Sequence, residues 1–254
     1  MLVLGIVGSP RKEGRTSALI DAALQGAADA GADVQKLYLI EHDIKPFASQ
    51  GGAAEGVRFL PTTLCDVCEP ADALVLGAPV YFGDINGLSK DFMDSVRIRN
   101  ENGKPAVGIA VAGGSGKGLL SGVQSIYHWF YHRQMRAIDP TPVTRFNEEM
   151  VLAALPASGA RLVEMAKAPQ PFPGAGREDR WAEIVAYYAG IPYLDQGPVD
   201  EFLMLAEQLI AISEGHAALE EARAAYAQAL DLAQQGDLAN AGRQAVRAYD
   251  LLLH

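Results

Sequence analysis

The stretch "LVLGIVGSPRKEGRTSALI", residues 2–20, joins a continuous apolar run to a loop rich in glycine, hydroxyl and basic residues. The run Leu2–Val7 predicts a buried strand that ends at the Gly-Ser-Pro turn. After the loop, Thr16 or Ser17 can cap a helix whose apolar residues repeat at helical spacing as far as Gly31. A buried strand that leads through a short loop into such a helix begins a strand–helix–strand unit.

The same alternation of strand and helix continues along the chain. Further strands are predicted at Val34–Leu39, Ala73–Ala78 and Ala106–Val111, with a fifth at Met135–Ile138 or Val143–Phe146. Helical stretches separate them, near Leu60–Glu69, Asn86–Arg97 and Leu119–Arg133. Parallel neighbours need a crossover of about a dozen residues, usually a helix, so the pattern predicts an α/β fold with a doubly wound, five-stranded parallel sheet. Ligands of such sheets bind beyond the carboxyl ends of the strands, so the loops after the strands are the candidate site.

Beyond Phe146 the pattern becomes helical. A helix interrupted at Pro156 is expected first, then a Pro- and Gly-rich connector over residues 167–179, then helices at Asp179–Ala189, Val199–Glu214, Ala217–Gln234 and Leu238–Leu253. The last two form a hairpin around "QQGD", with Leu219, Ala222, Tyr226 and Leu230 facing Leu238, Ala241, Ala245 and Tyr249. We therefore divide the chain into a sheet domain, residues 1–168, and a helical C-terminal extension, residues 169–254, which packs on the sheet domain or on a second subunit.

Composition narrows the classes of function. The 254 residues are 49% hydrophobic and 20% charged, as in an ordinary soluble globular protein. We expect neither a signal peptide nor a membrane span, and the two cysteines, Cys65 and Cys68, agree with a reducing compartment, so a cytoplasmic location is expected. A formal net charge of −10 repels a phosphate backbone, which argues against nucleic acid as a partner.

The first loop, residues 8–17, is suited to a phosphate group. Backbone amides at the helix start, the hydroxyls of Ser9, Thr16 and Ser17, and the guanidinium groups of Arg11 and Arg15 can converge on one phosphate ester. The P-loop pattern fails because Gly14 lies one residue too far from Gly8, and the G-x-G-x-x-G spacing of a dinucleotide site is missing too. A polar turn with its charges in solvent is the alternative.

The loops after the third and fourth strands complete the candidate site. In "APVYFGD", Pro79 is expected to end the strand and Gly83 to turn the chain, which places Val80, Tyr81 and Phe82 as a wall above the sheet edge. Flat aromatic faces there can cover a flat ligand. The loop "AGGSGKG", residues 112–118, carries four glycines, which suits close approach of backbone to a ligand.

Taken together, the three loops resemble those of the NADPH-dependent FMN reductases and iron-sulfur flavoproteins, which have the flavodoxin-like fold. "GSPRKEGRTSALI", "ADALVLGAPVYFGDINGLSKDFMD" and "GIAVAGGSGKG" occur in the family's order, over about residues 1–150. The resemblance implies that the FMN phosphate is bound by Ser9, Arg11, Arg15, Thr16 and Ser17. It further implies that the isoalloxazine is flanked by Pro79, Val80, Tyr81, Phe82 and Gly83, and closed on its other side by Ala112, Gly113 and Gly114. Arg15 stands where the family often has Asn.

Two features bear on metals. Iron-sulfur members carry a compact four-cysteine run after the second strand, whereas residues 43–56 here read "DIKPFASQGGAAEG" without cysteine, and a cluster needs about four thiolates. Cys65 and Cys68 form a C-x-x-C for which burial is favoured over a redox or metal role. His128 and His132 lie i, i+4 on one helix, and ordinary helix packing is favoured over metal binding, while Trp129 and Phe130 are expected to bury against the sheet or a partner subunit. We therefore expect no metal site.

The favoured function is an NAD(P)H-dependent, FMN-containing oxidoreductase. NADPH or NADH would supply hydride to FMN, and a small-molecule acceptor, such as a quinone or free flavin, would receive it, in a homodimer or homotetramer. No side chain is assigned a catalytic role. The alternatives are a flavodoxin-type electron carrier that acts with protein partners, and a non-catalytic module that uses the helical extension for interaction.

Overall fold

The computed structural model describes residues 1–45, 62–98, 101–174 and 176–253. Its centre is a sheet of four long parallel strands, β1 (Leu2–Val7), β2 (Asp33–Tyr38), β3 (Ala73–Tyr81) and β5 (Pro105–Ala112). The strand order is β2-β1-β3-β5-β6, so the chain reverses its direction across the sheet between β1 and β3. This is the doubly wound flavodoxin-like order, and it confirms the predicted fold class.

The fifth position of the sheet is split between two short strands. β6 (Arg136–Ala137) pairs with the start of β5, and β7 (Thr141–Val143) pairs with Ile109–Val111 near its end, both in parallel. Each of the two candidate stretches therefore contributes to this position, although only Val143 of the second lies in a strand. Pro140 and Pro142, which have no amide hydrogen to donate, lie at and beside the break.

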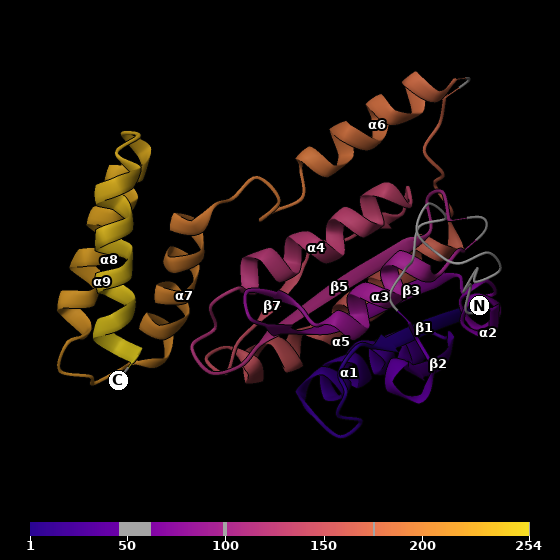
Figure 1. Cartoon of the computed structure of the whole chain (residues 1–254), viewed down its shortest axis with the longest axis horizontal. Coiled ribbons are helices and arrows are strands. Elements are labelled where there is room, and N and C mark those ends of the chain that lie inside the picture. Colours follow the sequence, from indigo (N-terminus) through magenta and orange to yellow (C-terminus); the bar gives the residue numbers. More distant parts are fainter. Residues whose placement is uncertain (46–61, 99–100, 175, 254) are drawn as a thin grey trace.

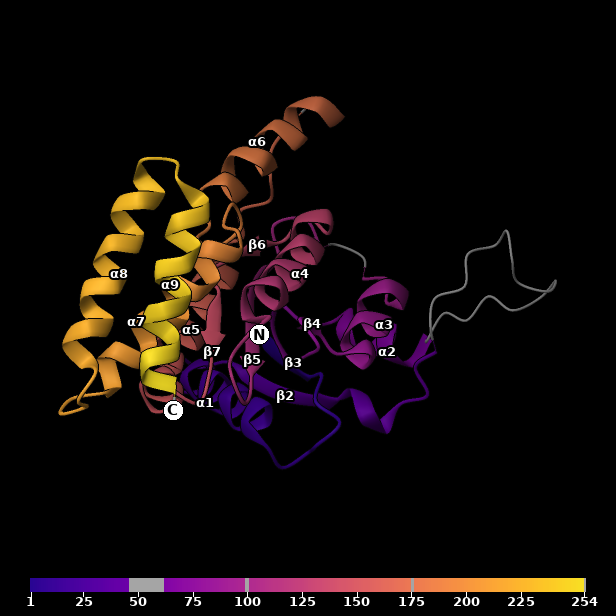
Figure 2. The ribbon, with the colours of Figure 1, turned by 60° about the vertical axis from the view of Figure 1, so that its left-hand side comes forward.

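Helices cover both faces of the sheet (Figures 1 and 2). On one face, α1 (Arg15–Asp29) and α5 (Glu148–Lys167) pack their apolar residues against those of β1, β3 and β5. On the other, the sheet meets α2 (Thr62–Cys68), α3 (Gly87–Ser95) and α4 (Leu119–His132). Trp129 and Phe130 of α4 are buried in this second core, so of the two expected places for them, the sheet and a partner subunit, the structure shows the sheet.

Helix α5 runs without interruption through Pro156, so the expected break there is wrong. Two glycines let α1 and α5 touch backbone to backbone at this point. A Cβ added at Gly26 of α1 would lie 1.9 Å from the carbonyl oxygen of Pro156, and one added at Gly159 would lie 1.8 Å from that of Ala23. The close packing of the two helices supports α5 on both sides of the proline.

Helix α6 (Arg177–Ala189) covers the open edge of the sheet, and two of its tyrosines satisfy edge carbonyls. Tyr187 Oη donates to the carbonyl oxygen of Ala137 at 2.7 Å, and Tyr188 Oη donates to that of Met135 at 2.8 Å. Ile184, Tyr188 and Ile191 belong to the core of the sheet. The α6 segment is therefore packed as part of the sheet's own structure.

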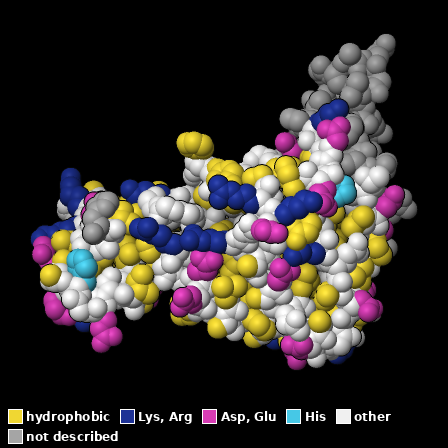
Figure 3. Space-filling view, turned by 90° about the horizontal axis from the view of Figure 1, so that it is seen from below, with side chains coloured by type: hydrophobic (Ala, Val, Ile, Leu, Met, Phe, Trp, Pro, Cys, Tyr) yellow, Lys and Arg dark blue, Asp and Glu magenta, His cyan; other side chains and the backbone are white. Residues whose placement is uncertain are grey.

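The last three helices, α7 (Pro198–Ile212), α8 (Leu219–Gln234) and α9 (Leu238–Leu253), have a core of their own. They stand at the end of the molecule away from the N-terminus (Figure 1), and the surface is hollowed between them and the sheet domain (Figure 3). The expected hairpin is present, but Leu230 and Leu238 are 37% and 61% exposed rather than facing each other. The expected Ala222, Ala241, Ala245 and Tyr249 are buried, as are Ala225, Ala229 and Ala248, which the prediction did not include. In the described part of the chain, no helix combines the length and apolar character that crossing a bilayer requires.

Candidate functional site

The loops after β1, β3 and β5 emerge side by side at the carboxyl edge of the sheet, because these three strands are parallel neighbours. The first loop starts against β3, where the amide of Gly8 donates to the carbonyl oxygen of Gly77 at 2.8 Å. The strand order reverses between β1 and β3, so the three loops surround the place where ligands of doubly wound sheets bind.

The first loop presents the start of α1 to this place. Gly14 caps the helix with extended backbone, no side chain caps it, and the first turn holds no acidic residue. The amides of the first turn are therefore available to an anion, which the helix dipole also favours. Ser9, Thr16 and Ser17 are all buried at this helix start, and the expected capping of α1 by Thr16 or Ser17 is wrong, because both residues lie inside the helix.

The cations of this loop differ in their partners. Arg11 is exposed, and within the described part of the chain its guanidinium makes no hydrogen bond or ion pair. Arg15 is tied through Nε to Glu148 Oε2 of α5 at 2.8 Å, which leaves the far end of its guanidinium for a ligand. Lys12 pairs with Glu41. The acidic partners Glu148 and Glu41 are distant in sequence from this loop, so no local pattern predicted these ion pairs.

A basic and a phenolic group reach the cradle from β2. Lys36 Nζ donates to Ser17 Oγ at 3.2 Å, and the oxygens of Ser17 and Tyr38 are 3.4 Å apart. The hydrogen bond from Lys36 lowers the pKa of Tyr38, and Lys36 also pairs with Asp21 at 2.6 Å. Sequence reasoning missed these two residues, although their i, i+2 spacing places them on one face of a strand.

The second loop corrects one expectation. Pro79 does not end the strand, because β3 continues to Tyr81, with Pro79 paired to Val111 and Val80 paired to Ala112. The short strand β4 (Asp84–Ile85) returns antiparallel beside this end, so Val80 is buried and forms no exposed wall. The missing amide of Pro79 costs the sheet one donor, while its carbonyl oxygen accepts from the amide of Asn86 at 2.9 Å.

The two aromatics of this loop are held outward, as expected. Tyr81 is 47% exposed and Phe82 is fully exposed. Phe82 lies in the left-handed region at φ 53°, which is uncommon for a bulky residue, and Gly83 follows at φ 93°. Backbone strain that displays an aromatic ring to solvent is typical of a ligand-binding segment.

A buried hydrogen-bond network that sequence reasoning missed joins the first and second loops. Asn86 Nδ2 donates to the carbonyl oxygen of Gly8 at 2.9 Å, and Ser89 Oγ donates to Asn86 Oδ1 at 2.6 Å. Gly8 is confined there, since an added Cβ would lie 1.9 Å from Ser89 Oγ. Asn86 precedes α3 but its side chain does not cap that helix, so the local sequence carried no signal for this network.

The third loop lies open on one side and closed on the other. Around Gly113 and Gly114, a Cβ would meet no atom within 4 Å, so backbone faces free space there, next to the buried Ala112 that ends β5. At Gly118, by contrast, a Cβ would lie 2.4 Å from the Cα of Gly83. The second and third loops therefore touch at Gly83 and Gly118.

These residues fit a flavin mononucleotide, with a phosphate cradle, displayed aromatics and an open glycine backbone along one edge. Over residues 1–147, the chain matches the family model described as NADPH-dependent FMN reductase. The chain belongs to that family. A member of the NADPH-dependent FMN reductase family is an FMN-dependent oxidoreductase, and the three loops at the carboxyl edge of the sheet are the candidate flavin site.

Curated relatives include iron-sulfur flavoproteins, and solved structures share the fold. An iron-sulfur flavoprotein of Methanocaldococcus jannaschii is 32% identical over 158 residues, which span 56% of this chain and 79% of that one. An iron-sulfur flavoprotein of Methanosarcina thermophila is 27% identical over 52% of this chain and 73% of its own length. A flavone reductase structure matches with a TM-score of 0.52 and 18% identity, covering 72% of this chain and 70% of that chain. An oxidoreductase structure from Corynebacterium diphtheriae matches with a TM-score of 0.51 and 16% identity, covering 64% of this chain and 96% of that chain. The last two likenesses establish the fold.

The relatives' names raise the question of iron, and this FMN reductase family member has two cysteines. Burial raises the pKa of the Cys68 thiol to about 12, which disfavours the thiolate that a cluster requires. The cysteine-free stretch after β2 lies mostly outside the described residues. In the described part, no three His, Cys, Asp or Glu side chains gather as a metal site, and His128 and His132 are exposed on α4.

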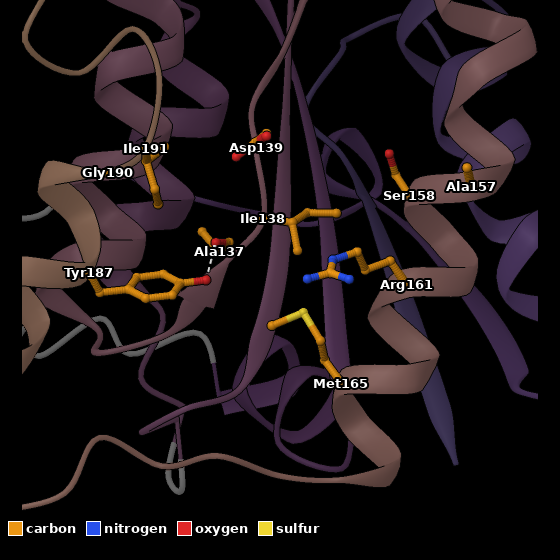
Figure 4. A pocket seen from close by; sticks show the side chains of 10 residues that line it. All are labelled: Ala137, Ile138, Asp139, Ala157, Ser158, Arg161, Met165, Tyr187, Gly190 and Ile191. Carbon is orange, nitrogen blue, oxygen red and sulfur yellow. Dashed lines mark hydrogen bonds between the residues drawn. The ribbon is translucent and has the colours of Figure 1, made fainter.

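A cavity of about 550 Å³ lies elsewhere, at the outer edge of the sheet. Figure 4 shows Arg161 and Met165 of α5 on one side and Tyr187 and Ile191 of the α6 segment on the other, with Ile138 between them. The flavin loops contribute no residue to its lining, so this cavity is distinct from the flavin site of the family.

Proposed function

We propose that the protein is an NAD(P)H oxidoreductase that passes hydride or electrons from a reduced nicotinamide, through FMN, to a small-molecule acceptor such as a quinone or free flavin. One observation carries the proposal. The first loop with its buried hydroxyl residues, the displayed Tyr81 and Phe82, and the open Gly113 and Gly114 follow β1, β3 and β5, which are parallel neighbours beside the reversal of strand order. A flavin accepts and donates both hydride and single electrons when bound, so it supplies the redox chemistry itself.

The chain's own residues would bind and orient FMN. Ser9, Thr16, Ser17 and the amides of α1 would hold the terminal phosphate, with Arg11 and Arg15 neutralising its charge. Tyr81 and Phe82 would cover one part of the isoalloxazine, and Gly113 and Gly114 would let the ring edge approach backbone closely. Because Phe82 is fully exposed, the mouth of the site is accessible to a nicotinamide or an acceptor.

The experiment is the visible spectrum of the protein purified with FMN, before and after anaerobic addition of NADPH or NADH. We expect flavin absorbance that bleaches on reduction and returns with a quinone. A protein that binds no FMN would contradict the proposal. Equal bleaching with NADPH and NADH would support the proposed function and would show that the protein has no preference between the two donors.

A flavodoxin-type electron carrier is the second candidate, and the net charge of −10 suits docking to basic protein partners. Aerobic consumption of NADPH or NADH by the purified protein separates the two, because a pure carrier consumes almost none without a reductase. We further propose a cytoplasmic homodimer or homotetramer, a state that sedimentation with and without FMN would measure.

A further inference from the structure

The helical extension contacts the third flavin loop directly. Tyr249 of α9 is wholly buried, and its hydroxyl donates to the carbonyl oxygen of Ser115 at 2.7 Å. Leu205 of α7 fills the space beside Gly116, where an added Cβ would lie 2.7 Å from Leu205 Cδ2. Two helices of the extension therefore contact the backbone of the loop at two consecutive residues, α9 at Ser115 and α7 at Gly116.

The same helices hold the residues that follow. Lys117 Nζ lies 5.3 Å from the ring centroids of both Phe202 and Tyr249, which is within cation–π range. The carboxylate of Glu201 accepts from the amide of Leu120 at 3.0 Å, at the start of α4. A carboxylate at a helix N-terminus is favourable, so the contact fixes the exit of the loop as well.

These contacts matter because the loop is costly to order. Gly114, Gly116 and Gly118 all have positive φ, and glycine loses more conformational freedom on ordering than any other residue. A loop that must be ordered at the moment of binding reduces affinity, whereas a loop ordered beforehand does not. The contacts of the extension with Ser115 and Gly116 therefore order a loop that its glycines leave flexible.

We propose that the extension is a working part of the flavin site, in which Tyr249 is a positioning residue that holds the third loop ready for FMN. The inference deepens the proposed function and rests on it. The stretch matched by the family model ends at residue 147, so Tyr249 lies outside it. Coupling is reciprocal, so FMN should in turn steady the contact between α9 and the loop.

The test compares Tyr249→Phe with Tyr226→Phe in the full-length chain. Both variants remove one hydroxyl from a tyrosine of the extension's core, but Tyr226 makes no hydrogen bond to the loop in the described structure. Hydrogen exchange is measured across residues 113–120 without flavin, and FMN affinity by quenching of flavin fluorescence. We expect Tyr249→Phe to speed exchange in the loop and to weaken FMN binding three- to tenfold, the range of one hydrogen bond. Tyr226→Phe should change neither.

The outcomes separate the two proposals. Loop exchange in Tyr249→Phe that equals wild type would overturn the inference whether or not flavin binds. Faster exchange with unchanged FMN affinity would overturn the coupling to flavin. A wild-type chain that binds no FMN refutes the proposed function, while the exchange measurement still decides whether Tyr249 holds the loop.

Discussion

At the scale of single residues, the phosphate cradle makes a sharp prediction. Replacing both Arg11 and Arg15 by alanine removes two cations from the helix start, and hydrogen bonds to charged groups contribute about 1.5–3 kcal/mol each. We expect FMN affinity to fall at least about tenfold, with a smaller change in the free energy of unfolding, because both side chains are exposed and the ion pair of Arg15 with Glu148 is reached by solvent.

Two comparisons control this measurement. Lys12→Ala lies in the same loop but removes a cation already paired with Glu41, so it should have a smaller effect on FMN affinity. Riboflavin lacks the phosphate, so its affinity should be the same in wild type and the double variant. An equal loss for riboflavin and FMN would show that the arginines do not bind the phosphate.

The sequence predicted the placement of individual residues where neighbouring residues in the chain determine it. Tyr81 and Phe82, for example, are displayed at the carboxyl end of β3, as expected. Residues that act through partners distant along the chain were missed, such as Glu148 beside Arg15 and Asn86 beside Gly8. Side chains that meet only through the sheet's topology leave no periodic pattern in the sequence.

At the scale of elements, the contact between α1 and α5 depends on glycine. Gly159→Ala would place a methyl group against the carbonyl of Ala23 and force the helices apart. We expect a loss of unfolding free energy of about 2–4 kcal/mol by chemical denaturation, at the upper end of overpacking costs. Gly242→Ala is the matched control, because this helical glycine of α9 meets only Val199 Cγ2 at 3.7 Å. Its helix should be unchanged or stabilised by up to about 1 kcal/mol, and equal losses in the two variants would contradict the packing argument.

Tyr188, which lies in α6 at the edge of the sheet, is expected to make the free energy of unfolding depend on pH in alkaline solution. Burial raises the pKa of Tyr188 above its ordinary value, so the folded state keeps this proton where the unfolded chain releases it. Its stabilising contribution is therefore complete below pH of about 10 and is lost as pH rises further. We expect Tyr188→Phe to cost about 1 kcal/mol at pH 7 through the lost bond to Met135, and to flatten the decline above pH 10. The exposed Tyr81→Phe should change neither quantity, and an alkaline decline as steep in Tyr188→Phe as in wild type would exclude the assignment.

Element boundaries followed the sequence closely where strands and helices alternate, and failed where tertiary contacts overrode a local rule. Proline predicted a break at Pro79 and at Pro156, and neither break occurs. Pro79 is paired with Val111 of β5 and is followed directly by the residues that pair with β4, and at Pro156 the helix is packed on α1. A missing amide is a fixed local cost, which enough pairing around it outweighs.

At the scale of the whole molecule, the core of α7–α9 is joined to the sheet domain at the third loop. The extension has its own apolar core, yet Tyr249, Leu205 and Glu201 contact the third loop and the start of α4. FMN that binds the folded chain at about a hundredfold over its dissociation constant should add about 2.7 kcal/mol to stability. For a chain of this length, that corresponds to a rise in Tm of about 5–10 °C. Because the cores share these contacts, we expect calorimetry to show one transition that moves as a whole on adding FMN. Two transitions, of which only one moves, would mean that the extension unfolds independently of the flavin site.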